Sequence, residues 1–275
     1  MLFSVGSYLP EHRIKASIDL SNSVNQIQED EYAQRCGFRA GLVTGTTIFA
    51  YMSRPLVDFA GRDWLERGST EVRFLHPIYE GEDIRITGCV SSLAKDGTVL
   101  IDYQAANNQG TVCAEGTARF PLGNVTPEPA RTDYPSGPGI LRRPISLEAL
   151  KIGDPLSPVT DEFNWNIHWP YCQKSIRDHH PMYEKTLHPG WLAGRANQML
   201  AANYSVLAWI DVSCQVQYFN IQEEECTIET RGRIQDRFER DGDHFIVLDL
   251  AFFSPTQCLA TMRYAAIFQI APNAA

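Results

Sequence analysis

The stretch GLVTGTTIFAYMSRPLVDFAG, residues 41–61, decides how this chain folds. Its apolar residues recur at helical spacing, Thr44 or Thr46 can cap the start of a helix, and Gly61 can end it. Pro55 lies inside this helix and should kink it or break it locally. Behind the helix, apolar and polar residues alternate, which predicts strands joined by turn residues. Four strands are expected, at 69–75, 83–91, 98–106 and 111–120.

The same pattern appears a second time, 145 positions further along the chain. Gly45 corresponds to Gly190, and the stretch that begins with Gly190 predicts a second long helix. A repeat of this length indicates two copies of one small domain rather than a solenoid. Four further pairs share the difference of 145: Trp64 and Trp209, Phe74 and Phe219, Asp96-Gly97 and Asp241-Gly242, Cys113 and Cys258. Strands are expected in the second copy at 210–219, 226–237, 244–253 and 258–270.

One helix followed by a run of strands makes each copy an α+β unit. The helix is the only long apolar element that can cover the apolar face of the strands, so we expect two antiparallel sheets, each wrapped around a central helix. Two such units can pair edge to edge about a pseudo-two-fold axis, which predicts a pseudo-dimeric monomer or a homodimer. The domains are expected at 1–120 and 147–275. The proline- and glycine-rich linker at 121–146 should be extended rather than packed.

The composition narrows the class of function. A formal net charge of −9 and the lack of a local Lys/Arg cluster argue against a nucleic-acid-binding protein. Seven scattered cysteines without C-x-x-C spacing are typical of reduced thiols rather than of disulfides or a zinc site. The first residues contain no apolar signal segment, and no apolar run approaches the length of a membrane span. We therefore expect a cytoplasmic protein with no metal site.

Several short segments carry a family resemblance. They are DEYA (30–33), GF (37–38), GLVTG (41–45) and FLHPIYEGED (74–83) in the first copy, with LKIGD (150–154) and HPG (188–190) in the second. Together they resemble the MaoC-like hot-dog family over nearly the whole chain outside the linker. The resemblance implies a double hot-dog fold. The family contains (R)-specific enoyl-thioester hydratases, dehydratases of acyl chains, and members of unknown role.

The hydratases of this family carry the motif Asp-x-Asn-Pro-x-His, followed by a His-Gly pair at the central helix. In the first copy, Ser23 stands in place of the Asp and Gln28 in place of the His. Thr44 replaces the His before Gly45. Neither Ser nor Gln exchanges protons usefully near pH 7. The first copy is therefore predicted to be non-catalytic.

The second copy keeps more of the motif. Asp178 stands in the place of the motif acid, and Tyr183 in the place of the motif His. The expected proton partner of Asp178 is His180, His188 or Tyr183. A carboxylate that orients an imidazole is suited to proton transfer at neutral pH. We expect the chemistry in this loop, and the alternative is a polar loop whose histidines only make structural hydrogen bonds.

The resemblance also implies where the substrate would lie. Gly190 and Gly45 open the two central helices, whose free N–H groups can polarise a thioester carbonyl. The alternative for both glycines is simple helix entry. Four aromatic residues are candidates for the wall of an acyl tunnel, although buried aromatic side chains more often serve only as core: Trp191, Tyr51, Trp169 and Tyr171. Arg177 and Arg195 could meet the phosphate of a pantetheine group, and the alternative, favoured for each of them alone, is a solvated surface side chain.

The resemblance favours a lyase that adds or removes water at the α,β position of an acyl-CoA or a carrier-bound acyl chain. Such an enzyme needs no cofactor of its own, because the substrate carries CoA or phosphopantetheine. An acyl carrier protein is then a candidate partner. Two alternatives remain: a hot-dog thioesterase, and a non-catalytic protein that binds acyl thioesters or assists a partner. Fold resemblance alone does not separate these functions.

Overall fold

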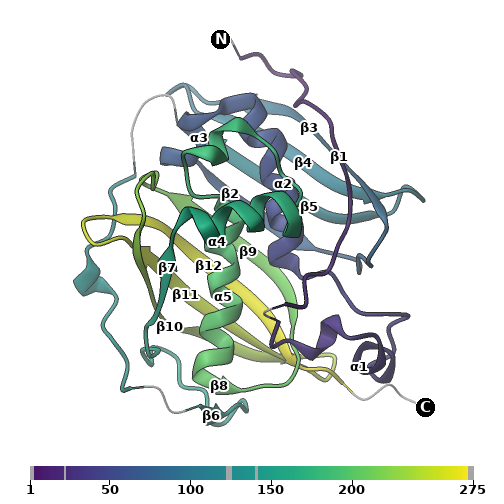
Figure 1. Cartoon of the computed structure of the whole chain (residues 1–275), viewed down its shortest axis with the longest axis vertical. Coiled ribbons are helices and arrows are strands. Elements are labelled where there is room, and N and C mark those ends of the chain that lie inside the picture. Colours follow the sequence, from purple (N-terminus) through teal and green to yellow (C-terminus); the bar gives the residue numbers. More distant parts are fainter. Residues whose placement is uncertain (1–2, 22, 122–125, 140–141, 272–275) are drawn as a thin grey trace.

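A single ten-stranded antiparallel sheet organises the molecule in the computed structural model, which describes residues 3–21, 23–121, 126–139 and 142–271 (Figure 1). The strand order is β1-β3-β4-β5-β2-β9-β12-β11-β10-β7. The first five strands belong to the first half of the chain, and the last five belong to the second half. The first five are β1 (His12–Lys15), β2 (Ser69–Phe74), β3 (Asp83–Leu93), β4 (Val99–Asn107) and β5 (Val112–Phe120); the others are β7 (Val159–Phe163), β9 (Ile210–Tyr218), β10 (Cys226–Arg240), β11 (Asp243–Phe253) and β12 (Cys258–Gln269).

The strand order is symmetric about its centre, as the sequence repeat predicts. Each of the four main strands of the first half has its counterpart 145 positions later, in the mirrored place of the sheet. The eight main strands were all predicted, within a few residues at their ends. The edge strands β1 and β7 were not predicted, because each is too short to show a clear alternation.

The expectation of two separate sheets is wrong. β2 and β9 pair along their whole shared length, with Ser69 opposite Gln217 and Val72 opposite Cys214, so the two halves share one continuous sheet. The central edges of the two halves therefore satisfy each other's backbone N–H and C=O groups, which would otherwise remain unpaired. The expected edge-to-edge pairing is confirmed, and it is what merges the sheets.

The two long helices lie on one face of the sheet and pack against each other (Figure 1). α2 (Gly45–Ala60) begins after Thr44, whose hydroxyl accepts the Thr47 N–H at 3.3 Å, and ends at Gly61 with a φ of 60°. The helix runs without interruption through Pro55, so the predicted local break does not occur. α5 (Pro189–Asn203) is its counterpart. The two helices and the inner face of the sheet form one apolar core that spans both halves.

Shorter elements frame these helices. α1 (Asp30–Arg35) precedes α2, and Gly37 follows α1 with a φ of 91°. α3 (Arg62–Arg67) and α4 (Trp165–Pro170) were not predicted. α4 continues directly into a single π-helical turn, Tyr171–Ser175, and 3₁₀ turns occur at Gln26–Gln28, Arg131–Asp133 and Pro181–Glu184. The two-residue strands β6 (Arg143–Pro144) and β8 (Tyr204–Ser205) pair in parallel.

The linker is more closely packed than its composition predicts. Within its described part, Tyr134 is buried against Phe253 on the outer face of the second half, and its hydroxyl donates to Asp249 at 3.0 Å. Arg131 lies over the same phenylalanine ring, 4.8 Å from its centroid. The expectation of an extended linker without packing is therefore wrong for this part. Residues 122–125 and 140–141 lie outside the described residues.

Candidate functional site

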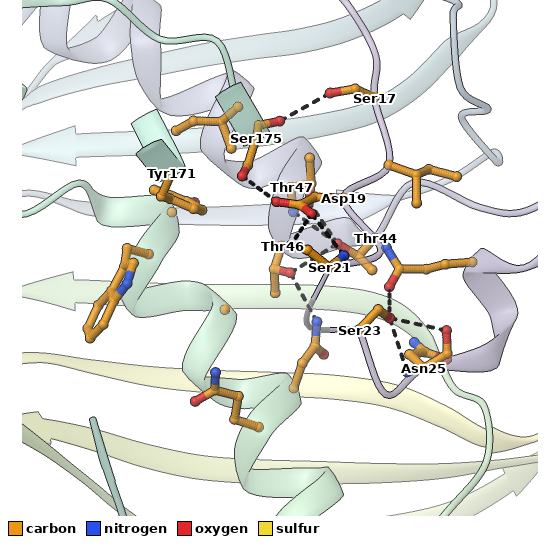
Figure 2. Close-up of a pocket in the computed structure, with 18 of the residues that line it drawn as sticks. Ser17, Asp19, Ser21, Ser23, Asn25, Thr44, Thr46, Thr47, Tyr171 and Ser175 are labelled. Carbon is orange, nitrogen blue, oxygen red and sulfur yellow. Dashed lines mark hydrogen bonds between the residues drawn. The ribbon is translucent and has the colours of Figure 1, made fainter. Parts of the chain in front are cut away.

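A cavity of about 910 Å³ lies where the two halves meet. The first half contributes the segment 17–28 and the first turn of α2. The second half contributes β7, the turn after α4, and the first three turns of α5. Figure 2 shows Ser23 and Asn25 on one side of this cavity, Thr46 and Thr47 near its middle, and Tyr171 and Ser175 on another side. The cavity is thus a joint product of both copies.

The degenerate motif of the first copy lines this cavity. Ser23 donates a hydrogen bond to the side-chain oxygen of Gln28, so these two residues are paired although neither can exchange a proton. Asn25 holds the loop against the second half, because its amide nitrogen donates to the Trp209 carbonyl at 2.9 Å and its oxygen accepts the Trp209 N–H at 3.0 Å. This segment therefore lines the cavity but contains neither an acid nor a base at positions 23 and 28.

The first turn of α2 is capped by a carboxylate of the other half. The Thr46 N–H donates to Asp211 at 3.1 Å, and the Tyr264 hydroxyl donates to the same carboxylate. Burial raises the pKa of Asp211, although these hydrogen bonds act in the opposite direction. Gly45 is needed here for space, because a methyl group on it would lie 2.5 Å from the Phe74 ring and 2.6 Å from Asp211 Cβ. Gly45 itself does not line the cavity.

The first turn of α5 is capped in a different way. His188 precedes the helix, and its Nδ1 accepts the Gly190 N–H at 2.9 Å. Gly190 lines the cavity, and its lack of a side chain permits close packing. A methyl group there would lie 2.3 Å from Ala50 Cβ and 2.7 Å from the Tyr171 hydroxyl oxygen. Gly190 therefore has a clear packing role between α2 and α5.

An ion pair spans β7 and α5 inside the cavity. Asp161 accepts from Arg195 at 3.0 Å, and a reoriented Gln198 amide places its nitrogen 3.0 Å from the same carboxylate. The Arg195 guanidinium lies over the Trp191 ring, 3.8 Å from the ring centroid. Asp161 keeps about a fifth of its side chain exposed, so a bound molecule can reach it.

The predicted catalytic residues come together, but away from the cavity. Asp178 accepts from His188 Nε2 at 3.3 Å and from Arg54 at 2.9 Å. Asp178 is 3% exposed, and both His188 and Tyr183 are fully buried. His180 instead faces Asp58 of α2, with 3.5 Å between Nε2 and the carboxylate. None of the four is among the residues that line the cavity. Their catalytic role stays a prediction, and this geometry favours an internal polar network.

The protonation of this network follows from its hydrogen bonds. His188 Nδ1 accepts the Gly190 N–H, so the ring proton resides on Nε2 and is donated to Asp178. Burial lowers the pKa of His188 more than the nearby carboxylate raises it. Burial would raise the pKa of Asp178, but the hydrogen bonds from His188 and from the His180 backbone, together with the charge of Arg54, hold that pKa below its usual range. Asp178 is therefore a carboxylate that neutralises Arg54, beside a neutral His188.

His168 extends the network towards α4. Its Nε2 accepts the backbone N–H of His188 at 2.9 Å, and burial lowers its pKa to about 3. Cys172 lies 3.6 Å from the same nitrogen, and burial raises the pKa of its thiol. A neutral imidazole beside a protonated thiol is not an activated nucleophile. The network therefore fixes the loop that carries His188 against both α2 and α4.

Of the four predicted substrate-binding residues, two line the cavity and two do not. Gly190 and Trp191 line the cavity, whereas Gly45 and Tyr51 do not. The Tyr51 hydroxyl instead accepts the Ser17 N–H at 3.2 Å. Asp161 and Asn197 were missed, because neither lies in a motif. The repeat contained a signal for Asn197, because this polar residue stands where the first copy has the buried apolar Met52 of α2.

No group of three or more His, Cys, Asp and Glu side chains is placed to hold a metal ion in the part of the chain that the structure describes. Of the helices described, none has both the length and the apolar character needed to cross a membrane.

Comparisons with known proteins support the fold. No protein-family model and no curated protein matches the chain. A MaoC domain protein from Chloroflexus aurantiacus J-10-fl, for which dehydratase activity has been suggested, matches with a TM-score of 0.70 at 12% identity, over 96% of this chain and 95% of that one. A conserved hypothetical protein of Mycobacterium tuberculosis with a double hotdog fold matches with a TM-score of 0.66 at 12% identity, over 96% of each chain.

A suggested oleoyl thioesterase from Lactobacillus plantarum matches less closely. Its TM-score is 0.54 at 12% identity, over 96% of this chain and 97% of that one. The structural neighbours of this chain therefore include MaoC-type and double hot-dog proteins over nearly its full length. The chain has the double hot-dog fold, and at this level of identity the likeness concerns the fold alone.

Proposed function

We propose that the chain binds an acyl thioester in the cavity between its halves and adds or removes water at the α,β position of the acyl group. The observation that carries this proposal is the place of the cavity, which opens between the first turns of α2 and α5 and the motif loop of the first copy. The structural neighbour from Chloroflexus, for which dehydration is suggested, shares this architecture over 96% of the chain. A volume of about 910 Å³ is within the range of small-molecule sites.

The rim of the cavity carries exposed side chains of both signs. Lys174 and Arg177 lie there, together with Asp19, Glu80 and Glu162. Two cations at the entrance can pair with the phosphates of CoA or of phosphopantetheine. Deeper in, the apolar stem of the ligand can pack on Trp191.

Asp161 is the carboxylate that we assign to the water. Another acid at the cavity, Asp19, is more exposed than Asp161; it accepts from Ser21 and Ser175, and these bonds lower its pKa against the effect of burial. Asp161 would take a proton from water as the oxygen bonds to the β carbon. The electron pair of the double bond then forms an enolate, and the same carboxyl returns the proton to the α carbon. Atoms and charges balance without any cofactor.

Two alternatives have specific support. The lining of the cavity favours hydrolysis of the thioester. It contains a carboxylate, and no histidine is among the described lining residues. Activation of water for attack on a carbonyl needs only one base. Binding without catalysis is favoured by the inert Ser23 and Gln28 at the motif positions.

A substrate panel separates the three functions. The protein is mixed with crotonyl-CoA and with longer enoyl-CoAs, and binding is measured by titration calorimetry. Loss of the enone absorbance indicates hydration, and release of free thiol indicates hydrolysis. Binding without either signal supports the non-catalytic alternative. No binding across the panel would refute the proposal as a whole.

A further inference from the structure

We propose that the hydroxyl group of Tyr171 is the hydrogen-bond donor for the carbonyl oxygen of the bound thioester. This inference rests on the proposed function and assigns the donor that polarises the substrate. In the fold as expected from sequence, that donor would be a backbone N–H at the start of a central helix. The structure favours a side chain instead.

The helix amides are already engaged by the chain itself. The Gly190 N–H donates to His188 Nδ1 at 2.9 Å, and residue 189 is a proline without an N–H group. At α2, the Thr46 N–H donates to Asp211 at 3.1 Å, and the Thr47 N–H donates to Thr44. A ligand carbonyl would have to displace a buried His188 or a buried Asp211 to reach these donors. Both side chains are fixed by further hydrogen bonds, so displacement is costly.

Tyr171 provides a donor at the same place. Its hydroxyl oxygen lies 2.7 Å from the point that a Cβ on Gly190 would occupy, so it lies directly against the first turn of α5. Tyr171 lines the cavity (Figure 2). The hydrogen bonds of the described residues include none to this hydroxyl group, so its proton is free for a ligand. Burial raises the pKa of Tyr171, which keeps the group protonated and able to donate at neutral pH.

The segment that presents Tyr171 is unusual. Tyr171 begins the single π-helical turn that follows α4, directly after Pro170. Turns of this type are rare and often occur at functional sites. The described residues 145 positions earlier than α4 form no helix. In the second half, α4 and this turn bring a hydroxyl group to the start of α5, beside the guanidinium of Arg195.

Other donors in the cavity are less suitable. Asn197 donates to the Thr46 hydroxyl at 3.0 Å, and its oxygen accepts from Trp209 at 2.9 Å. The Ser175 hydroxyl donates to Asp19. A neutral phenol can donate a hydrogen bond to a carbonyl oxygen in the ground state, and this bond strengthens as the oxygen gains negative charge. The oxygen gains charge both when water attacks the β carbon and when it attacks the carbonyl carbon. The assignment therefore holds for both hydration and hydrolysis.

Removal of one hydroxyl group tests the proposal. Tyr171→Phe is compared with Tyr218→Phe, because the Tyr218 hydroxyl is also without a partner among the described residues but is buried outside the cavity. Two probes are titrated calorimetrically: crotonyl-CoA, and S-butyl-CoA, a thioether without a carbonyl group. We expect Tyr171→Phe to weaken crotonyl-CoA binding about 3- to 10-fold, which is the usual value of one neutral hydrogen bond, and to leave S-butyl-CoA binding unchanged. Tyr218→Phe should change neither.

The outcomes separate this inference from the proposed function. If the unmodified protein binds neither probe, the proposed function fails and the assignment fails with it. If it binds crotonyl-CoA and Tyr171→Phe binds both probes as before, only the assignment of Tyr171 is overturned. Equal weakening of both probes by Tyr171→Phe would also overturn it, because a loss of cavity shape would then explain the effect. Where the substrate panel detects turnover, Tyr171→Phe should lower kcat by about 100-fold.

Discussion

Replacement of Asp178 by asparagine should destabilise the protein strongly. The change keeps the shape of the side chain and removes the charge that neutralises Arg54 and accepts the ring proton of His188. Only 4% of the Asp178 side chain is exposed, so water cannot take over these roles. Loss of one partner of a buried ion pair costs about 3 to 5 kcal/mol. Arg54 retains Asp58 as a second partner, so we expect the lower value, about 3 kcal/mol.

Urea unfolding at pH 7.5, followed by circular dichroism, measures this loss. A decrease of that size should also lower the thermal midpoint by roughly 6 to 12 °C. Asp96→Asn is the matched control, because Asp96 lies in an exposed hairpin turn where asparagine can accept the same Thr98 N–H. It should leave the unfolding midpoint unchanged.

The catalytic interpretation of Asp178 makes a different prediction. If Asp178 activates the water, Asp178→Asn should lower turnover by about 100-fold or more, as expected for a lost general base. The structural interpretation predicts lower stability with turnover largely retained at a temperature where the variant is folded. A variant as stable as the unmodified protein but inactive would refute the reasoning from burial.

Three further predictions follow from the same geometry. Asp161→Asn should reduce the turnover found in the substrate panel by about 100-fold or more while crotonyl-CoA still binds, and retained turnover would exclude Asp161 as the base. The pKa of His168 is about 3 in the folded protein and about 6.5 when unfolded, so its contribution to stability is present above pH 6.5 and is lost as the pH falls. Between pH 7.5 and pH 5 this loss should be about 2 kcal/mol, and urea titrations of His168→Gln should show a pH dependence weaker by that amount. Thr230→Val should raise the free energy of unfolding by about 1 kcal/mol, because the buried Thr230 hydroxyl has no partner among the described residues. A lower free energy of unfolding in a urea titration of this variant would show that the hydroxyl has a partner.

The sequence predicts the strands of this fold well, because one face of each is buried. Along β4, for example, Val99, Ile101 and Tyr103 are buried while Asp102 is exposed, and this alternation is visible in the residues themselves. The pairing of β2 with β9 leaves no such trace. Backbone hydrogen bonds form whatever side chains the strands carry, so the sequence could not distinguish two adjacent sheets from one.

The site was harder to predict. The sequence predicts that Asp178 and His188 lie close together, because they are near neighbours along the chain, and in the structure they are hydrogen-bonded. Their burial depends on Arg54 and His168, which lie on other elements of the chain. The residues near Asp178 and His188 do not reveal these contacts, and taken alone they indicate a reactive loop. Asp161 has no local motif at all, and only the fold brings β7 beside α5.

The continuous sheet also determines which strand edges remain open. Because β2 and β9 pair with each other, the outermost strands of the sheet in the described residues are β1 and β7. Both are short, with four and five residues, and β1 carries Arg13 and Lys15. Short, charged outer strands are poor templates for the addition of another chain. Fusion of the two copies therefore protects the protein from edge-to-edge aggregation.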